Sequence, residues 1–252
     1  MKVGSVLLAL LPAVAGAAPV RGVDWDWQLS EKIDPPAGIT AFDADKDSVT
    51  RGQVAALTGA GVYTICYVSV GTLERYRADA AHFPKAVVGK TYGDWPDEKF
   101  LDIRRLDVLL PLMRARFERC KALGFDAIEP DNMDVYDNDS GFDLTADDTV
   151  RYITALADLA HGMGLEFGQK NVPELTDRLI GKMDFIVTES CFQDSWCQDV
   201  VAYPQAGKPV FDAEYTDRPI NWQRACKTAA WLNISMILKD RDLTPGRKSC
   251  NE

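Results

Sequence analysis

The stretch GFDAIEPDNMDVY, residues 124–136, decides the fold of this chain. A short apolar run ends there in three polar side chains, those of Glu129, Asp131 and Asn132. In a parallel α/β barrel, side chains at the carboxyl ends of several strands meet in one pocket. The pattern therefore predicts an α/β fold, a single (β/α)8 barrel of the TIM type with parallel strands. The same change from apolar to polar recurs in EFGQKN (Lys170, Asn171), FIVTES (Glu189), PVFDAEY (Glu214) and SMILKD (Lys239, Asp240).

Apolar, β-prone runs supply eight candidate strands for this barrel, and helical patterns alternate with them. Alternation of strand and helix indicates a parallel sheet. Residues 23–29 fit either an extra strand or a covering loop, and a doubly wound open sheet is the alternative fold. The candidate strands are residues 39–43, 62–70, 100–103, 127–129, 166–168, 185–188, 210–213 and 235–238. The helical patterns cover residues 48–58, 109–123, 144–164, 173–180 and 222–232, and Thr145 is the predicted cap of the third.

The first residues, MKVGSVLLALLPAVAGAAPV, have the form of a secretory signal peptide, with one cation at Lys2, an apolar run and then small residues. We therefore expect a signal peptide over residues 1–18 and one barrel domain over residues 19–252. A chain of 252 residues that is 46% hydrophobic can bury one substantial core. Since no other segment is long and apolar enough to cross a bilayer, we expect a secreted, extracellular protein without a membrane partner.

The six cysteines favour disulfide bonds, because the expected compartment is oxidising. Six cysteines allow 15 pairings. Cys191 and Cys197 are near enough in the chain to close a small loop directly after Glu189. A bond from Cys226 to Cys250 would tie down the last helix and would leave Cys66 for Cys120. Two sequons, at Asn138 and Asn233, offer sites for glycans.

The formal net charge of the whole chain is −10, and it becomes −11 without Lys2 of the signal peptide. A negative chain of this size argues against nucleic acid as a partner. The charge fits both a soluble extracellular surface and a groove for a cationic substrate.

The residue types at the strand ends limit the chemistry of the predicted pocket. The chain has only two histidines, which argues against a histidine triad and against a zinc site. A pocket rich in carboxylates suits either a hard cation or acid and base catalysis on an acetal. Tyr67 and Tyr215 follow strands and are the aromatic candidates for contact with a sugar, whereas Trp27 and Phe192 are expected to pack in the core. The polar strand-end groups are Asp43 with Asp45, Ser69, Asp102, Glu129 with Asp131 and Asn132, Lys170 with Asn171, Glu189, Glu214, and Lys239 with Asp240.

A resemblance to a known family rests on motifs spread along nearly the whole chain after the signal peptide. They are DWDWQLS, CYVSVGTLERYRADAAHFP, WPDEKFLDIR, GFDAIEPDNMDVYDNDSGFDLTADD, GQKN and TESCF, followed by EY and KD. The chain resembles glycoside hydrolase family 114, the endo-α-1,4-polygalactosaminidases. The resemblance implies a (β/α)8 barrel that cleaves α-1,4-linked galactosamine polymers inside the chain. We expect no cofactor and a monomer whose partner is a cationic galactosamine-containing polysaccharide.

The resemblance also assigns roles to individual residues. It implies that Asp131 of the EPDN motif and Glu189 of the E-x-C-F motif are the catalytic pair. By analogy with retaining α-galactosidase-like barrels, whose carboxylates also follow the fourth and sixth strands, we expect Asp131 to be the nucleophile and Glu189 the acid and base. Their carboxyl groups should lie about 5 Å apart if the enzyme retains anomeric configuration. The other expected substrate-binding residues are Tyr67, Ser69, Asn132 and Tyr215 at strand ends, Asp43, Asp102, Glu129, Glu214 and Asp240 for amines, and Lys170, Asn171 and Lys239 for hydroxyl groups. For Lys170 and Lys239, an internal ion pair is the alternative.

Two other functions remain open at this point. One is a non-catalytic extracellular carbohydrate-binding protein of the wall or of development that keeps the same barrel. The other is a cation-dependent hydrolase that acts on an extracellular ester.

Overall fold

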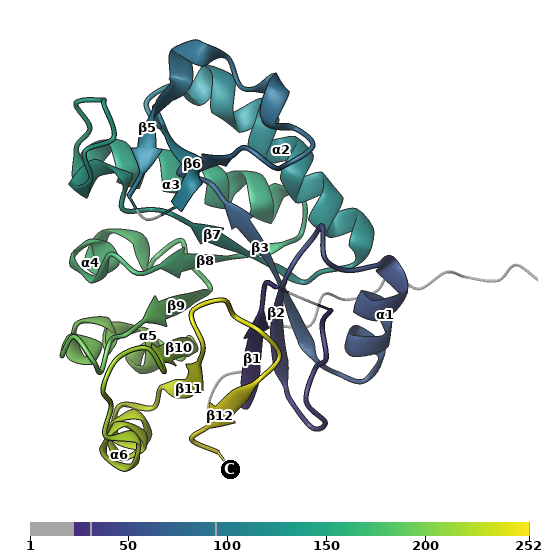
Figure 1. Ribbon diagram of the computed structural model, residues 1–252, viewed down its shortest axis with the longest axis vertical. Helices are drawn as coiled ribbons and strands as arrows, with labels where there is room; N and C mark the ends of the chain where they lie inside the picture. The colour runs from purple at the N-terminus through teal and green to yellow at the C-terminus, as the bar shows by residue number, and fades with distance from the viewer. Residues whose placement is uncertain (1–22, 31, 94, 252) are drawn as a thin grey trace, which may run out of the picture.

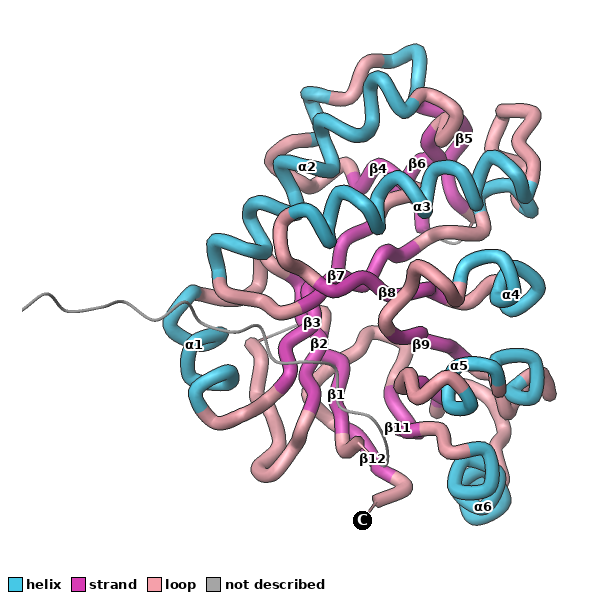
Figure 2. Tube along the Cα trace, turned by 180° about the vertical axis from the view of Figure 1, so that it is seen from behind, coloured by secondary structure: helices cyan, strands magenta, loops and turns pink. Residues whose placement is uncertain are grey.

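The computed structural model describes residues 23–30, 32–93 and 95–251, so the predicted signal peptide lies outside the described residues. Eight parallel strands follow one another around a nearly closed barrel, and helices cover its outside (Figures 1 and 2). The predicted barrel is confirmed. The barrel strands are β1 (Trp25–Gln28), β2 (Ala41–Asp45), β3 (Tyr63–Ser69), β7 (Ala127–Asp131), β8 (Glu166–Lys170), β9 (Phe185–Glu189), β10 (Val210–Tyr215) and β11 (Ser235–Lys239).

The barrel closes between its first and last parallel strands through side chains. The indole Nε1 of Trp25 donates to the carbonyl oxygen of Ser235 at 2.9 Å, and Lys239 pairs with Asp26 at 2.9 Å. Strand β12 (Arg247–Ser249) pairs antiparallel with β11 and completes the main sheet.

Two of the strand predictions need correction. Residues 100–103 were expected to form a barrel strand, but β6 (Trp95–Leu101) runs antiparallel between β4 (Thr72–Glu74) and β5 (Val88–Tyr92) in a separate sheet. Within residues 23–29, which fit either an extra strand or a covering loop, residues 25–28 form the first barrel strand. The two corrections offset each other in the count, so that Asp131 still ends the fourth parallel strand and Glu189 the sixth.

The helices lie close to the predicted ranges, and their local signals explain the ends. In α3 (Ala146–Gly162), the hydroxyl of Thr145 accepts from the backbone N–H of Asp148, which confirms the predicted cap. The predicted helix over residues 173–180 is divided into a 3₁₀ turn and a short α-helix. The other α-helices are α1 (Arg51–Gly59), α2 (Leu106–Leu123), α4 (Thr176–Leu179), α5 (Ala202–Gln205) and α6 (Trp222–Leu232). The 3₁₀ turns are Ala80–His82, Lys85–Val87, Val135–Asp137, Pro173–Leu175 and Cys197–Val200.

Aromatic side chains fill the amino end of the barrel. Trp25, Tyr63 and Phe185 begin their strands, and Phe211 is the second residue of β10. Phe211 lies 5.2 Å from Trp25 and 5.9 Å from Phe185 between ring centroids, and all four rings are buried. Because burial of apolar surface stabilises this end as a packed core, polar side chains can gather only toward the carboxyl ends of the strands.

Three disulfide bonds tie the outer elements to the barrel. Cys66 joins Cys120, Cys191 joins Cys197 and Cys226 joins Cys250, so all three predicted pairs are confirmed. The second bond closes the loop that follows β9. Within the described residues, no helix has the length and apolar character that a membrane span requires.

Candidate active site

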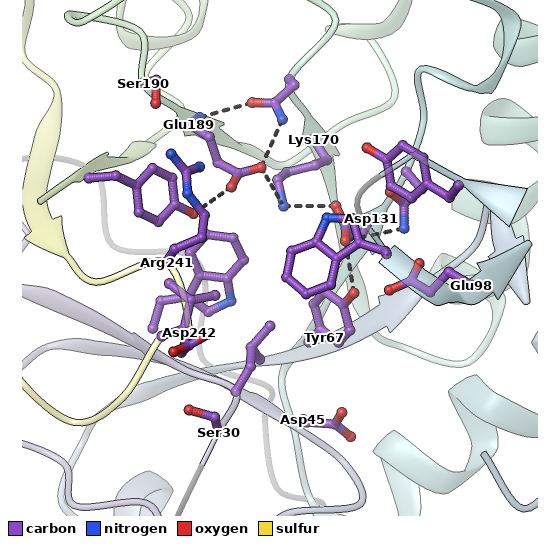
Figure 3. A pocket seen from close by; sticks show the side chains of 18 of the residues that line it. Ser30, Asp45, Tyr67, Glu98, Asp131, Lys170, Glu189, Ser190, Arg241 and Asp242 are labelled. Atoms are coloured by element: carbon purple, nitrogen blue, oxygen red, sulfur yellow. Dashed lines mark hydrogen bonds and ion pairs between the residues drawn. The ribbon is translucent and has the colours of Figure 1, made fainter. Parts of the chain in front are cut away.

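A pocket of about 750 Å³ opens at the carboxyl ends of the barrel strands. Asp131, Lys170 and Glu189 are the last residues of the neighbouring strands β7, β8 and β9, and all three line the pocket (Figure 3). A volume of this size suits a ligand of a few sugar rings.

The chain turns sharply directly after each of these three residues. Asn132, Asn171 and Ser190 have φ angles of 62°, 48° and 56°, in the left-handed region that residues other than glycine rarely adopt. Such conformations are costly and gather at functional sites. The turns end the strands at the point where the charged side chains reach the pocket.

Lys170 joins the two candidate catalytic carboxylates. Its Nζ lies 2.9 Å from Oδ1 of Asp131 and 3.3 Å from Oε2 of Glu189, and it also contacts Oε1 of Glu129 at 2.9 Å. The ammonium group lies over the ring of Trp27, 4.4 Å from its centroid. Burial alone would lower the pKa of Lys170, but the three carboxylates raise it well above its usual value, so the side chain stays charged.

Each candidate carboxylate also accepts a hydrogen bond from one tyrosine. Tyr67 donates to Oδ2 of Asp131 at 2.8 Å, and Tyr215 donates to Oε1 of Glu189. Burial and the adjacent carboxylate raise the pKa of each phenol well above its usual value, so both remain donors. Burial alone would raise the pKa of Asp131, but Lys170 and Tyr67 hold it below its usual range.

Asn171 fixes the position of Glu189 through both ends of its amide. Its Nδ2 donates to Oε2 of Glu189 at 3.0 Å, and its Oδ1 accepts from the backbone N–H of Glu189 at 2.9 Å. The two candidate carboxylates are thus held rigidly, which a catalytic pair requires.

Five of the predicted substrate-binding residues line the pocket, and seven do not. Tyr67, Asn132, Lys170, Asn171 and Tyr215 belong to the lining. The seven others are buried beneath the pocket or paired outside it, and they are Asp43, Ser69, Asp102, Glu129, Glu214, Lys239 and Asp240.

Asp43 and Glu129 face the barrel interior one layer below the pocket. Side chains two residues apart in a strand point the same way, so Asp45 and Asp131 reach the pocket while Asp43 and Glu129 lie deeper. Both deeper carboxyl groups have no solvent exposure. No N–H or O–H group of the described residues donates to Asp43. Burial and the neighbouring Glu129 raise the pKa of Asp43 well above its usual value, which favours the protonated form of this carboxyl group.

Among the remaining five residues, Glu214 and Lys239 have structural partners away from the pocket. Glu214 accepts from the backbone N–H groups of Phe192 and Gln193, and this anchors the loop that carries the Cys191–Cys197 bond. Lys239 is fully buried against Asp26, as in the alternative considered for it.

Asp102 and Asp240 serve local contacts, and Ser69 is buried. Asp102 pairs with Arg104 at 2.7 Å at the end of β6, away from the barrel strands. Asp240 accepts from the backbone and hydroxyl of Thr244. The hydroxyl of Ser69 lies 2.6 Å from that of Thr72.

The sequence interpretation missed a group of lining residues that come from loops and from the β4–β5–β6 sheet. Glu98 lies in WPDEKFLDIR, four positions before Asp102, and Asp134 lies two positions after the EPDN motif, so the motifs themselves were the available signal. No periodic pattern marks the arginines at the rim. The missed residues are Tyr76, Arg77, Tyr92, Glu98, Asp134, Asp194, Arg218, Arg241 and Asp242.

Comparison with known proteins gives a family and a fold. The model of glycoside hydrolase family GH114 matches residues 10–252. The crystal structure of Aspergillus fumigatus Ega3 in complex with galactosamine is 32% identical, with a TM-score of 0.88, and the match covers 94% of this chain and 98% of that one.

Two more distant structures share the fold alone. The glycoside hydrolase domain of PelA from Pseudomonas aeruginosa is 13% identical, with a TM-score of 0.69 over 90% of this chain and 98% of that one. An α-galactosidase from Thermus thermophilus is 11% identical, with a TM-score of 0.56 over 91% of this chain and 59% of that one. No curated protein matches the chain.

Proposed function

Because the chain belongs to glycoside hydrolase family GH114, we propose that it hydrolyses α-1,4-linked galactosamine polymers inside the chain, with Asp131 and Glu189 as its catalytic pair. One observation carries the proposal: both carboxylates contact the same ammonium group, that of Lys170, at the base of one pocket.

The separation of the two carboxylates supports a retaining mechanism. Since the contacts to Nζ of Lys170 are 2.9 Å and 3.3 Å long, Oδ1 of Asp131 and Oε2 of Glu189 lie at most about 6.2 Å apart, the sum of the two. Retaining glycosidases place their carboxyl groups about 5 to 5.5 Å apart, whereas inverting ones leave about 6.5 to 9.5 Å for a water molecule.

Asp131 suits the role of nucleophile, because Lys170 and Tyr67 keep it ionised. In the first step its carboxylate oxygen forms a bond to the anomeric carbon, while Glu189 gives a proton to the departing glycosidic oxygen. In the second step Glu189 takes a proton from water, and the water oxygen replaces Asp131 at the anomeric carbon. Lys170 stays charged throughout and offsets the negative charge of the pair.

The negative charge of the chain supports a galactosamine polymer as the substrate. A polymer of free galactosamine carries one ammonium group on each unit, and a chain with a net charge of −10 attracts a polycation. The relative Ega3, which is 32% identical, has been crystallised with galactosamine.

Secretion is part of the same proposal. Three disulfide bonds persist best in an oxidising compartment, and the leader-like residues 1–18 provide a route to it. A polysaccharide outside the cell is then within reach of the enzyme.

Product analysis on defined α-1,4-galactosamine oligomers tests the proposal. We expect shorter oligomers with new reducing ends, cleavage at internal bonds, and the α-anomer as the first product seen by NMR. Binding without any new reducing end would contradict hydrolysis and favour a non-catalytic carbohydrate-binding protein. A β-anomer as the first product would contradict retention alone.

A further inference from the structure

One wall of the pocket comes from β6, a strand outside the barrel, and this wall presents the carboxylate of Glu98. Figure 3 shows Glu98 on the same side of the pocket as Asp131, with its carboxylate turned toward the open centre. We propose that Glu98 binds the ammonium group of a galactosamine unit and so makes the enzyme select free galactosamine over its N-acetylated form. This inference rests on the proposed function and names a specificity-determining residue for it.

Glu98 keeps an unused acceptor at the pocket. Its Oε2 accepts from the hydroxyl of Thr72 at 2.6 Å, while no described residue donates to Oε1 and no described cation pairs with the side chain. An ammonium group of a substrate would provide both a donor and the missing opposite charge.

All the other acids of the lining except Asp134 have charged partners or lie in water. Asp45 pairs with Arg77, Asp194 pairs with Arg218, and Asp131 and Glu189 share Lys170. Asp134 accepts from the amide of Asn138 and lacks a cation, and Asp242 is exposed at the rim, where water screens its charge. Glu98 and Asp134 are therefore the half-buried lining acids with a free oxygen and no paired cation, and of these two we choose Glu98 because hydrogen bonds through Thr72 and Asn132 link it to Asp131.

A chain of hydrogen bonds fixes Glu98 relative to the nucleophile. Because an ionised carboxylate only accepts, the hydroxyl proton of Thr72 points to Glu98, and Ser69 then donates to Thr72. Asn132 in turn donates to Ser69 at 3.0 Å and lies 3.3 Å from Oδ2 of Asp131. The buried Ser69 and Asn132 therefore orient Glu98 and connect it to the site of reaction.

The electrostatic environment of Glu98 also favours a cationic ligand. Burial, together with Glu74 and Asp131, raises the pKa of Glu98 to about 7. A bare carboxylate is costly at this position, and an incoming ammonium group would remove part of that cost. A neutral acetamido group would leave it in place.

Aromatic side chains beside Glu98 complete a surface for a sugar unit. Trp95, on the same strand, is 48% exposed and lines the pocket, as do Tyr92 of β5 and Tyr76. Such rings pack against the apolar face of a sugar, while the carboxylate is available for the amine.

The experiment compares Glu98→Gln with the wild type and with Asp97→Asn. Glutamine keeps the acceptor for Thr72 and removes the charge. Asp97 is the matched control, since it directly precedes Glu98 in the same strand, is exposed and lies outside the pocket lining. Its change to asparagine removes the same charge. The readout is the ratio of kcat/KM on a free galactosamine oligomer to kcat/KM on its N-acetylated counterpart.

We expect this ratio to fall about ten- to a hundred-fold in Glu98→Gln, the range for loss of a charge-assisted hydrogen bond, and to stay near the wild-type value in Asp97→Asn. An unchanged ratio in Glu98→Gln, or an equal fall in both variants, would overturn the inference while leaving the proposed function intact.

Equilibrium binding provides a readout that does not need turnover. An Asp131→Asn background blocks cleavage, so that binding can be measured alone. In this background, Glu98→Gln should weaken binding of the free oligomer by a similar factor and binding of the acetylated oligomer much less. Equal weakening of both oligomers would overturn the inference. Failure of the wild type to cleave any galactosamine oligomer would overturn the proposed function instead.

Discussion

Asp131 and Glu189 end two strands that are not neighbours, yet both contact the ammonium group of Lys170, which ends the strand between them. One cation therefore sets the spacing of the two carboxylates and neutralises part of their repulsion. This relationship leads to predictions about activity, stability and pH.

Asp131→Asn and Glu189→Gln should each lower kcat on galactosamine oligomers by about 10²- to 10⁴-fold, because each removes a group that forms or breaks a bond to a proton or carbon. Both side chains are only partly exposed, but the amides keep their shape, so far-UV circular dichroism should be unchanged. Asp194→Asn, at the rim of the pocket, is the control. Wild-type turnover in either variant would exclude that residue from the mechanism.

Lys170→Met should destabilise the protein by about 3 to 5 kcal/mol, because it leaves the buried Glu129 without its cation. Urea unfolding at neutral pH measures the loss. The matched control is Lys182→Met, whose pair with Asp158 is about half exposed on both sides and should be worth less than about 1 kcal/mol. Equal stability of the two variants would show that Lys170 does not hold the acidic layer together.

Asp43→Asn should flatten the dependence of stability on pH. The folded-state pKa of Asp43 is raised by burial and by Glu129, so the folded protein keeps a proton that the unfolded chain releases near pH 4. Stability of the wild type therefore falls as pH rises from that point toward the folded-state pKa, by about 1.4 kcal/mol per pH unit for this proton.

Asparagine has nearly the shape of aspartic acid and does not titrate. Urea unfolding from pH 4 to pH 8 should give a shallower decline for Asp43→Asn, with the largest gain over the wild type at the upper end. Parallel curves for the two proteins would contradict a raised pKa of Asp43 in the folded state.

The preference for free galactosamine should depend on pH through Glu98. Its pKa, raised by burial, Glu74 and Asp131, is about 7, so its carboxylate loses its charge as pH falls below that value. We expect KM on the free oligomer to rise on going from pH 7.5 to pH 5.5 in the wild type and to change less in Glu98→Gln. Steady-state kinetics at matched ionic strength measures this, and an identical pH profile in both proteins would count against it.

The three disulfide bonds should differ in what their removal costs. In the loop-entropy relation, bonds that close longer loops constrain the unfolded chain more. Double alanine variants should lose about 4 kcal/mol for Cys66–Cys120, whose sequence separation is 54, and about 2 kcal/mol for Cys191–Cys197, whose sequence separation is 6. Unfolding midpoints measured under one set of conditions show which variant loses more stability. A larger loss for the Cys191–Cys197 variant would contradict the loop-entropy relation for this protein.

The second of these variants should also lose activity beyond its loss of stability. The Cys191–Cys197 loop follows Glu189 directly, and Glu214 holds it through the backbone of Phe192 and Gln193. Turnover measured well below the unfolding temperature separates the two effects.

The strand-end pattern predicted the barrel and placed Asp131, Lys170 and Glu189 in one pocket, since parallel strands bring their carboxyl ends to the same side. The resemblance to a family then selected the catalytic pair. The pattern did not tell which apolar run joins which sheet. Residues 100–103 read as a barrel strand, but β6 pairs antiparallel outside the barrel, because its partners β4 and β5 are chosen by contacts that local sequence does not encode.

Local sequence determined which side chains follow the strands, where helices begin, and which family the chain belongs to. Tertiary structure alone decided how deep each acid lies. Asp43 and Asp45 look equivalent in the sequence, yet closure of the barrel buries the first beside Glu129 and leaves the second at the pocket. Tertiary structure also brought Glu98 from a separate sheet to the catalytic carboxylates. Depth and proximity across a barrel depend on pairing between distant segments, and burial then fixes which carboxyl groups keep a proton and which remain free to meet a substrate.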